Sequence, residues 1–488
     1  MPFLIYVIVV LAIYKLFKFY QTVNKLPNGP LPLPFIGNLH QIDPCGPHKT
    51  IAKWGKQYGV VFTVWLPNVN LVITDYDTMK EALIKHADVF AGRPSIFINN
   101  LYSQGNHGVI FSEGKRWKEQ RRFSLHVLRD FGFGRPLMEE KIMAQTSTLV
   151  HRILERLPDS AIMDLHPLVQ LCVGNIISDV VFGHTFDNDL TRFQFLRDLL
   201  EENIRTFQRP TTLMLNEYPW LRFVPLFNNF SYTILNRNVT NLRQFIQLEV
   251  DNHLQKMKVD KSDEDFLSVY LREKAKGVSD SFNDMQTIIV MSDLFVAGME
   301  TTVTTLRWAF LYMIRYPQVQ AKVQQEIDQV LGADATVQMS DRNQMPYTAA
   351  TIAEIQRKAN IVPLNVQHKT TEEVNIAGYN IPANITILPQ ISAVLDDSTI
   401  FPEPQKFSPE RFLKDGQLEI AEQLVPFSMG KRKCMGEPLA RMELFLILVT
   451  LLQKFNFSVP PGQPIPEEKP VLGGTIAPAQ YECRVTAR

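Results

Sequence analysis

The sequence predicts a mainly α-helical chain with a minor β part (α+β), preceded by a single membrane-spanning helix. Three observations support this prediction: an apolar run at residues 3–16, a region at 137–271 with helical segments separated by Pro, Asn or Asp, and short β-rich runs towards both ends. The 488 residues contain no internal repeat and no Gly/Ser linker. Because 50 Lys and Arg balance 50 Asp and Glu, no net charge attracts nucleic acid, and we expect no nucleic-acid partner.

A membrane anchor is predicted at residues 1–20. Residues 3–16 (FLIYVIVVLAIYKL) are apolar except for Lys15, and with residues up to Tyr20 the run is long enough for a bilayer core of about 30 Å if Lys15 and Lys18 reach the interface. A cleaved signal peptide is the alternative, but no basic segment precedes the run and no A-x-A-like site follows it. Lysines after the run and none before it favour a cytosolic body.

A proline-rich hinge is predicted at residues 21–38, and one large domain at 39–488. Proline fixes φ and lacks an N–H donor, so LPNGPLPLPFIGN (26–38) should be stiff and extended, either as a linker or as a docking segment. In the body we expect strands at 60–65 and 71–75, helices over most of 137–271, a strand–turn–strand at 374–388 and a last helix at 438–455.

A very long helix is expected in the middle of the chain. Ser281 is a suitable N-cap, and Pro317 should end the helix at Tyr316 because the residue before proline disfavours helical geometry. At 1.5 Å per residue, such a helix would be on the order of 50 Å long, enough to cross a large domain.

One cysteine occupies an unusual loop, FSMGKRKCMGEP (427–438), just before the last predicted helix. The positive end of the helix dipole, free backbone N–H groups and the basic residues 431–433 would stabilise a Cys434 thiolate. Gly430 and Gly436 would give the clearance that a large flat cofactor needs, and Phe427 would shield the sulfur from water. A buried structural cysteine or a nucleophile is the alternative at this stage.

The loop resembles the haem-binding signature of the cytochromes P-450, FxxGxRxCxG, at every fixed position: Phe427, Gly430, Arg432, Cys434 and Gly436. The resemblance extends from the anchor to residues 473–481 and is closest to the microsomal, family-two-like members. It implies the cytochrome P-450 fold with its long central helix, a haem-thiolate catalytic domain at 39–488, and haem b (iron protoporphyrin IX) with Cys434 as the iron ligand.

The long helix carries DLFVAGMETT (293–302), which resembles the oxygen-activation motif of this family. Gly298 is unfavourable in mid-helix by about 1 kcal/mol, so we expect a groove there for a small molecule such as dioxygen; a helix-packing glycine is the alternative. Thr301 is expected to bond the carbonyl of Ala297, and Glu300 with Thr301 would deliver protons during catalysis. By the resemblance, Ala297 also contacts the cofactor.

Two further motifs concern structure and cofactor binding. Glu354, Arg357 and Arg411 resemble the ExxR and PERF elements, which implies a buried structural network behind the cysteine loop. WKEQRR (117–122) resembles the motif in which Trp117 and Arg121 face the haem propionates, and Arg432 and His368 are further propionate candidates by the same resemblance. The neighbouring lysines and arginines, namely Lys115, Arg116, Lys118, Arg122, Lys431 and Lys433, could form a basic face for an acidic electron donor.

The resemblance implies a monooxygenase that uses O₂ to hydroxylate or epoxidise a small lipophilic substrate, such as a fatty acid, a steroid or a xenobiotic. Electrons would come from NADPH through NADPH–cytochrome P-450 reductase, with cytochrome b5 as a further candidate partner, because the chain has no dinucleotide fingerprint. The expected location is the endoplasmic reticulum membrane with the catalytic domain facing the cytosol, and residues 213–227 would touch membrane lipid. Substrate contacts are expected from residues 99–114, 202–214, 290–301, 361–367 and 473–478.

Three other functions remain open on the sequence alone. The first is a haem-thiolate protein that binds lipid or gas without turnover; the Glu300–Thr301 pair argues against it. The second is a peroxide-using isomerase, which would need neither that pair nor a basic face for a reductase. The third is a thiol hydrolase with Cys434 as nucleophile, although none of the ten histidines lies in the cysteine motif.

Overall fold

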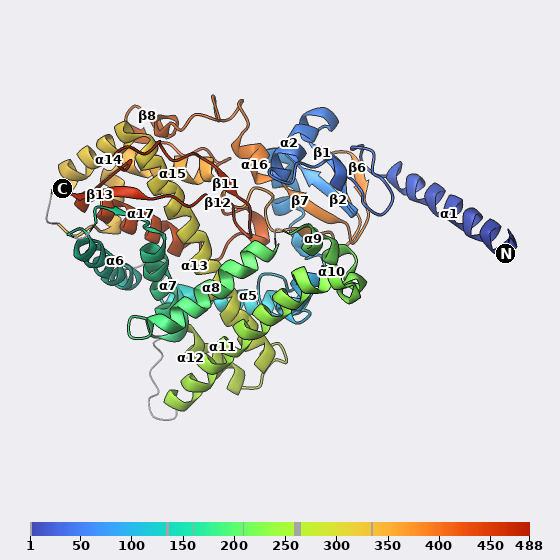
Figure 1. Ribbon diagram of the computed structural model, residues 1–488, viewed down its shortest axis with the longest axis horizontal. Coiled ribbons are helices and arrows are strands. Elements are labelled where there is room, and N and C mark those ends of the chain that lie inside the picture. The colour runs from blue at the N-terminus through green and yellow to red at the C-terminus, as the bar shows by residue number, and fades with distance from the viewer. Residues whose placement is uncertain (1, 133–135, 159, 208, 258–264, 333–334) are drawn as a thin grey trace. The chain divides into compact units, whose positions relative to one another are not determined.

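The structure is a computed structural model that describes residues 2–132, 136–158, 160–207, 209–257, 265–332 and 335–488. The chain forms two compact units, each assembled from segments far apart in the sequence (Figure 1). Unit 1 consists of Met1–Ile96, Val362–Pro402 and Phe427–Lys433, and unit 2 consists of Phe97–Ile361, Glu403–Pro426 and Cys434–Arg488. The predicted mainly helical fold with a small β part is confirmed.

Unit 1 is built around a four-stranded sheet with the order β1-β2-β7-β4. Its strands are β1 (Val61–Leu66), β2 (Asn68–Ile73), β7 (Thr386–Pro389) and β4 (His368–Lys369). The first two pair antiparallel, as expected from the runs at 60–65 and 71–75, whereas β7 joins β2 in parallel. Apolar side chains of the sheet pack against Ile51 and Trp54 of α2 (Pro47–Tyr58), which gives this unit its own core.

A hairpin and three further helices complete unit 1. They are β5 (Val374–Ile376), β6 (Tyr379–Ile381), α1 (Pro2–Val23), α3 (Tyr76–Lys80) and α16 (Ile391–Leu395), with short helical turns at Leu39–Gln41, Glu81–Lys85, Val89–Ala91 and Gly430–Arg432. Ala377 and Gly378 both have positive φ, the geometry of a tight hairpin turn. The strand–turn–strand predicted at 374–388 is therefore confirmed in its first half, but β7 belongs to the four-stranded sheet.

The segment after α1 is docked on β1 and is not a free linker. Thr63 donates to the carbonyl of Pro27 (2.6 Å), and the Asn38 side chain donates to the carbonyl of Pro30 (3.0 Å). A Cβ at Gly37 would lie 2.1 Å from the carbonyl oxygen of Trp65, and φ at this residue is +57°, so only glycine fits. The helix before it is solvent-exposed over the apolar span Phe3–Val23, which is long enough to cross a membrane.

Unit 2 contains most of the helices and a single large apolar core. Its helices are α4 (Phe97–Ser103), α5 (Gly114–Asp130), α6 (Pro136–Arg156), α7 (His166–Phe182), α8 (Leu190–Phe207), α9 (Pro210–Glu217), α10 (Pro225–Phe227), α11 (Thr233–Met257), α12 (Phe266–Ala275), α13 (Asp284–Arg315), α14 (Pro317–Val330), α15 (Pro346–Ala359) and α17 (Glu437–Lys454). The helical region predicted at 137–271 is confirmed for its described residues; residues 159, 208 and 258–264 lie outside them.

Unit 2 also contains short strands, some of which pair segments far apart in the sequence. They are β3 (Ile162–Met163), β8 (Leu413–Lys414), β9 (Gln417–Leu418), β10 (Phe455–Ser458), β11 (Pro470–Val471), β12 (Ala477–Pro478) and β13 (Cys483–Ala487). The order β10-β13-β3 brings the C-terminus beside the strand before α7, while β11-β12 and β8-β9 are separate hairpins. The last helix expected at 438–455 is confirmed as α17, one residue earlier at each end.

Helix α13 is the predicted long helix, and it packs against α7, α11 and α17 (Figure 1). The predicted cap is wrong: Asn283 accepts the N–H of Gln286 (2.9 Å), whereas the Ser281 hydroxyl lies 3.3 Å from the amide nitrogen of Gln120. The helix ends at Arg315, one residue before the predicted end at Tyr316, and Pro317 opens α14. Two thirds of the apolar window of α13 is buried, so this helix belongs to the core.

Gly298 of α13 serves helix packing. An added Cβ would lie 2.8 Å from the side chain of Ile177 on α7. The groove predicted at this glycine is therefore wrong, because the neighbouring helix occupies the space, and the alternative of a packing glycine is correct.

Candidate active site

Cys434 lies three residues before the first residue of α17. Its sulfur accepts hydrogen bonds from the backbone N–H groups of Gly436 and Glu437. The side chain is accessible to solvent, yet enough protein surrounds it that burial raises the pKa of the thiol. The two N–H groups and the positive charge of Arg121 act in the opposite direction, so they favour the thiolate. The loop thus presents an accessible sulfur whose anion the backbone can stabilise.

The two glycines of the cysteine loop lack a side chain for different structural reasons. Gly430 has φ +73°, and a Cβ there would lie 1.9 Å from the carbonyl oxygen of Leu83, so its clearance serves a backbone contact within unit 1. An added Cβ at Gly436 would meet only the Cys434 sulfur, at 3.9 Å. The open space expected for a flat cofactor is therefore found at Gly436, and the expectation for Gly430 is wrong because a neighbouring backbone takes that space. Phe427 is half-buried.

The basic residues of the loop contact their own unit. Lys431 pairs with Asp88 (2.5 Å), and Nε of Arg432 donates to the carbonyl of Ala91 (2.8 Å). These contacts hold both side chains on the 88–91 segment. The groups that favour the Cys434 thiolate are therefore the loop N–H groups of Gly436 and Glu437 and the side chain of Arg121 on α5.

His368 and Arg432 lie together with an arginine that the sequence analysis missed. Arg93 is buried and donates to the carbonyls of Val366 (3.0 Å) and Gln367 (2.5 Å). Burial, together with the charges of Arg93 and Arg432, lowers the pKa of His368 well below its usual value. Positive charge therefore accumulates in a buried part of unit 1, an arrangement that suits anionic groups.

The tautomer of His368 follows from its neighbour. Nδ1 lies 2.7 Å from the carbonyl of Phe90, and because a carbonyl only accepts, Nδ1 carries the proton. Nε2 of the neutral ring is then an acceptor. The predicted propionate bond from His368 therefore requires the ring to take up a second proton, which its lowered pKa opposes.

In unit 2, Trp117 and Arg121 lie one turn apart on α5. The guanidinium is 6.0 Å from the centre of the buried Trp117 ring. Burial lowers the pKa of Arg121, while the Cys434 sulfur acts against this shift, so the cation and the sulfur belong to one electrostatic environment. That this pair faces the haem propionates stays a prediction.

Glu300, Thr301 and Ala297 lie on one stretch of α13. The Thr301 hydroxyl donates to the carbonyl of Ala297 (2.8 Å), so the predicted contact is confirmed. Burial raises the pKa of the Glu300 carboxyl above its usual value. The stretch therefore holds a carboxyl that keeps its proton more readily than an exposed glutamate, beside a hydroxyl bonded to its own helix.

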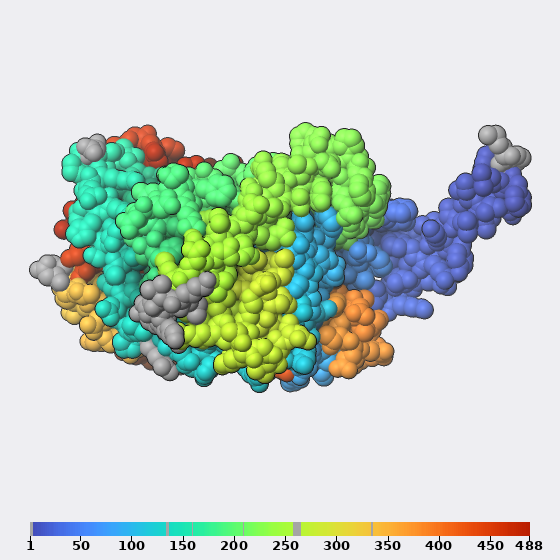
Figure 2. Space-filling model, turned by 90° about the horizontal axis from the view of Figure 1, so that it is seen from below, coloured from blue at the N-terminus to red at the C-terminus, as the bar shows by residue number. Residues whose placement is uncertain are grey.

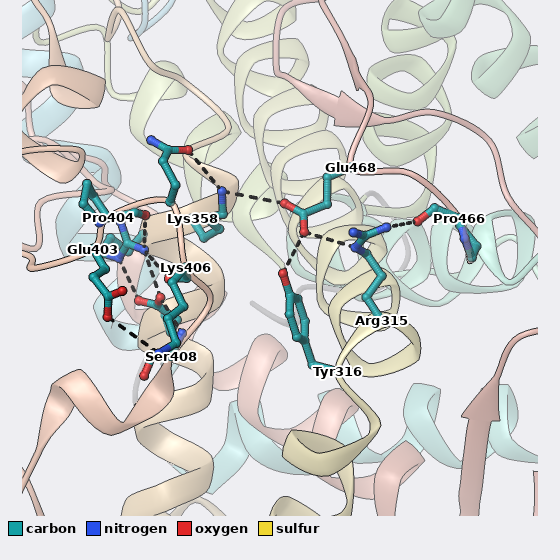
Figure 3. Close-up of polar contacts among 12 residues, drawn as sticks. Arg315, Tyr316, Lys358, Glu403, Pro404, Lys406, Ser408, Pro466 and Glu468 are labelled. Carbon is teal, nitrogen blue, oxygen red and sulfur yellow. Dashed lines mark hydrogen bonds and ion pairs between the residues drawn. The ribbon is translucent and has the colours of Figure 1, made fainter. Parts of the chain in front are cut away.

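The predicted structural network is present in unit 2 and completely buried at its centre. Arg357 binds both oxygens of Glu354, at 2.7 and 2.9 Å, and Nε of Arg411 lies 3.0 Å from the same carboxylate. The N–H of Ser408 completes the carboxylate's contacts (2.9 Å), and Arg357 also donates to the carbonyl of Pro404 (2.8 Å; Figure 3). The network joins α15 to residues 403–412.

A second network, which the sequence did not reveal, surrounds Glu468 (Figure 3). Its carboxylate accepts from Arg315 (3.1 Å) and from the Tyr316 hydroxyl (2.9 Å), and it lies 3.7 Å from Lys358. Lys358 is therefore part of this second network. These contacts join the end of α13 to α15 and to residue 468.

The predicted basic face on α5 borders a groove of about 1420 Å³ between α5, α12 and residues 278–282. Helices α11 and α12, in yellow-green, lie on the face of unit 2 shown in Figure 2. The groove is lined by basic residues, Lys115, Arg116, Arg122, His126 and Lys276, and by acidic residues, Glu119, Asp130, Glu273 and Asp280. Its charge is therefore mixed, since acidic residues of α5 and of the facing segments alternate with the basic ones.

Comparison with known proteins identifies related chains. The sequence model of the family "Cytochrome P450" matches residues 27–483. Cytochrome P450 2J2 of Homo sapiens is 38% identical over 463 residues, which cover 94% of this chain and 90% of that protein. Cytochrome P450 2B19 of Mus musculus is 38% identical over 480 residues, covering 96% and 95%. A 3-ketosteroid oxygenase of Caenorhabditis elegans is 34% identical over 485 residues, covering 98% and 83%.

Members of the matched family bind haem b through a cysteine ligand, and the residues around Cys434 in unit 2 fit such a group. The Cys434 sulfur is accessible and has two N–H donors, and the space beside Gly436 is open. Arg121, also in unit 2, is of the type that binds carboxylates.

Proposed function

The chain belongs to the cytochrome P450 family and is a monooxygenase of that family, and from this premise we propose that it inserts one oxygen atom of O₂ into a lipophilic substrate by hydroxylation or epoxidation. The observation that carries the proposal is the Cys434 sulfur with its two backbone N–H donors. Haem b, when bound, supplies the iron at which dioxygen is reduced. Cys434 would be the iron ligand, and Phe427, Gly430 and Gly436 would shape the loop around it.

The propionates of the cofactor would be held by cationic side chains. Trp117 and Arg121 of α5 are proposed for this role in unit 2, and Arg432 in unit 1. Arg93 joins them because it lies with Arg432 beside His368. His368 would contribute only after gaining a proton, since its Nδ1–H is already donated to Phe90.

Protons for the reaction would pass through α13. Because burial raises the pKa of Glu300, this carboxyl would hold a proton more readily than an exposed glutamate and could pass it on. Thr301 would orient the receiving group, with its own hydroxyl held at the carbonyl of Ala297. Ala297 itself has no bulk to obstruct the cofactor side of the helix.

We propose steroids as the first substrate class to examine, because a relative that covers 98% of this chain is named a 3-ketosteroid oxygenase. Fatty acids and xenobiotics are the other classes. The predicted substrate segments are rich in apolar residues, and in unit 2 they include the buried stretch of α13 from Val290 to Phe295.

Electrons would come from NADPH through NADPH–cytochrome P450 reductase, and cytochrome b5 is a second candidate donor. The α5 groove with its alternating charges is the proposed docking face for such a partner. The exposed apolar residues Trp220, Phe223 and Leu226 are proposed to touch membrane lipid in addition to α1.

The proposed location is the endoplasmic reticulum membrane, with the body of the protein in the cytosol. Residues 1–20 would be the anchor, 21–38 the hinge and 39–488 the catalytic domain. Deletion of residues 1–20 should release the protein from membranes only in part if the Trp220 region also binds lipid. Complete release in a flotation assay would contradict the second contact.

The test of the haem-thiolate assignment is a reduced, carbon-monoxide difference spectrum of the purified protein. We expect a strongly red-shifted Soret band, and we expect Cys434→Ala to lose both this band and product formation with reductase. Cys45→Ala, which changes another accessible cysteine, is the matched control. A band typical of histidine-ligated haem in the unmodified protein would contradict Cys434 as the ligand. An intact red-shifted band without product under reductase would favour a binding protein or an isomerase.

A further inference from the structure

The carboxyl of Glu300 is held by two threonine hydroxyls. Oε1 lies 3.3 Å from Oγ1 of Thr304 and 3.2 Å from Oγ1 of Thr475, and the two hydroxyls are 3.3 Å apart. Thr304 lies one turn further along α13, whereas Thr475 lies in the turn between β11 and β12, 175 residues away in the sequence. Both threonines are buried. The three oxygens therefore form a compact triangle shielded from solvent.

The backbone around Thr475 is fastened to α13. Nε1 of Trp308 donates to the carbonyl of Ile476 (2.9 Å), and Arg307 donates to the carbonyl of Pro478 (3.0 Å). The N–H of Ile476 also donates to the carbonyl of Ile361 (2.8 Å). These bonds fix the turn relative to the helix, so the hydroxyl of Thr475 is directed to one place.

The other threonines near Glu300 on α13 have already used their hydroxyl protons. Thr301 donates to Ala297, Thr302 donates to Glu443 (2.9 Å), and Thr305 donates to the carbonyl of Thr301 (2.9 Å). Since a hydroxyl has one proton to donate, these three side chains cannot serve Glu300 in the same arrangement. The direct hydroxyl partners of the carboxyl are thus Thr304 and Thr475.

We propose that Thr475 is a positioning residue which, together with Thr304, holds the Glu300 carboxyl at the β11–β12 turn. The inference rests on the proposed role of Glu300 in proton delivery. The triangle has a complete hydrogen-bond arrangement for either form of the acid. When Glu300 is ionised, both hydroxyls donate to Oε1; when it is protonated, one hydroxyl turns its proton to the other. When Glu300 passes its proton to an acceptor outside the triangle, the two threonines therefore need only hydroxyl rotation to adjust.

The charges around Glu300 set the direction of the expected effect. Burial raises the pKa of the carboxyl, the two hydroxyls and Arg307 of α13 lower it, and Glu201 of α8 raises it. Removing the hydroxyl of Thr475 takes away a donor that favours the ionised form. The pKa of Glu300 should then rise further, and the carboxyl should lose its fixed orientation.

The experiment is an infrared pH titration of the haem-loaded enzyme, in which the carboxyl band lost in Glu300→Gln is assigned to Glu300. We expect Thr475→Val, which keeps the shape but lacks the hydroxyl, to raise the titration midpoint by about one pH unit. Thr475→Ser should restore the midpoint. Thr305→Val, which removes a hydroxyl bonded elsewhere on the same helix, should leave it unchanged. Thr304→Val should act like Thr475→Val and replaces it if that variant fails to load haem.

An unchanged midpoint in Thr475→Val or in its replacement Thr304→Val, or no recovery in Thr475→Ser, would overturn the positioning role. The role of Glu300 itself is checked separately through the ratio of product formed to NADPH consumed in Glu300→Gln. If this ratio stays normal while Thr475→Val shifts the midpoint, the proton-delivery proposal fails and the positioning role stands. A lowered ratio together with a shifted midpoint supports both.

Discussion

Two glutamates, the buried Glu354 on α15 and the half-buried Glu300 on α13, occupy opposite kinds of surroundings. Glu354 faces two arginines and a backbone N–H, with contacts between 2.7 and 3.0 Å. Glu300 has two threonine hydroxyls at 3.2 and 3.3 Å, and burial raises its pKa. The first carboxylate is paired directly with fixed positive charge, whereas the direct hydrogen-bond partners of the second are neutral hydroxyls that can rotate.

The difference is the one expected if one residue type serves structure at Glu354 and, as we propose, proton delivery at Glu300. A carboxylate paired with buried arginines stays charged, since either partner alone would be an uncompensated buried charge. A carboxyl bonded only to hydroxyls remains able to exchange its proton, because those donors tolerate both forms. Replacing each glutamate by glutamine tests this contrast directly.

The largest effect is expected at Glu354. Glu354→Gln leaves Arg357 and Arg411 without their carboxylate, so the free energy of unfolding should fall by about 3–5 kcal/mol. Urea unfolding followed by circular dichroism measures this change. Glu410→Gln, which breaks an exposed pair with Lys322, is the control and should cost less than about 1 kcal/mol. A similar small cost at Glu354 would mean that the network is not structural.

The same substitution at Glu300 should affect turnover and leave stability nearly unchanged. Glu300→Gln keeps an oxygen for Thr304 and Thr475 but cannot release a proton, so the rate of product formation should fall about 100-fold. Product and NADPH are to be measured together, with unfolding in urea as the second measurement. Destabilisation comparable to that of Glu354→Gln would remove the contrast between the two sites.

A third glutamate extends the comparison to an acid with one hydroxyl partner. Burial raises the pKa of Glu443 on α17 to about 8; Thr302 donates to its Oε2 (2.9 Å), and Oε1 has no hydrogen-bond partner among the described residues. The folded protein therefore keeps a proton that the unfolded chain releases, and stability should fall as the pH rises from about 4.5 to about 8.

Glu443→Gln should remove this contribution, flattening the slope of unfolding free energy against pH by about 1 kcal/mol per pH unit. Urea unfolding at several pH values across this window measures the slope. Asp293 is a useful comparison, because burial raises its pKa to about 7 and its own slope should persist in the Glu443 variant. An unaltered slope in Glu443→Gln would show that Glu443 does not titrate there.

The smallest effect is expected at Glu468, whose side chain is partly exposed. Glu468→Gln weakens contacts to Arg315, Tyr316 and Lys358, and solvent already screens these pairs. The loss should stay below about 1 kcal/mol in the same urea assay. A loss of 2 kcal/mol or more would place this second network beside the Glu354 network as a determinant of stability.

The sequence predicted those features that depend on neighbours close along the chain. The helical bond from Thr301 to Ala297 and the Glu354–Arg357 pair span four and three residues, so helical periodicity was enough to find them. The position of Cys434 before α17 followed in the same way. Arg411 was found through a family motif, because no local rule connects it to residue 354.

The errors of the sequence analysis concern competition between local and distant partners. Ser281 and Asn283 are both good caps, and contacts of Ser281 with Gln120 leave the cap to Asn283. A glycine in mid-helix at position 298 required an explanation. Only the packed structure shows that the Ile177 side chain leaves no room for a Cβ there. Arg93 and Thr475 were missed because their partners lie far away in the sequence. Arg93 donates to the carbonyls of residues 366 and 367, and Thr475 donates to Glu300.

Local composition and spacing in the sequence were enough to predict the mainly helical fold and the exposed apolar N-terminal helix, while the family and the candidate cysteine ligand followed from the resemblance of motifs. The tertiary structure decided which buried acids are paired with cations and which with hydroxyls, and which glycines serve packing. These outcomes depend on the desolvation and charge that chain segments impose on one another after they meet, and no local pattern records them.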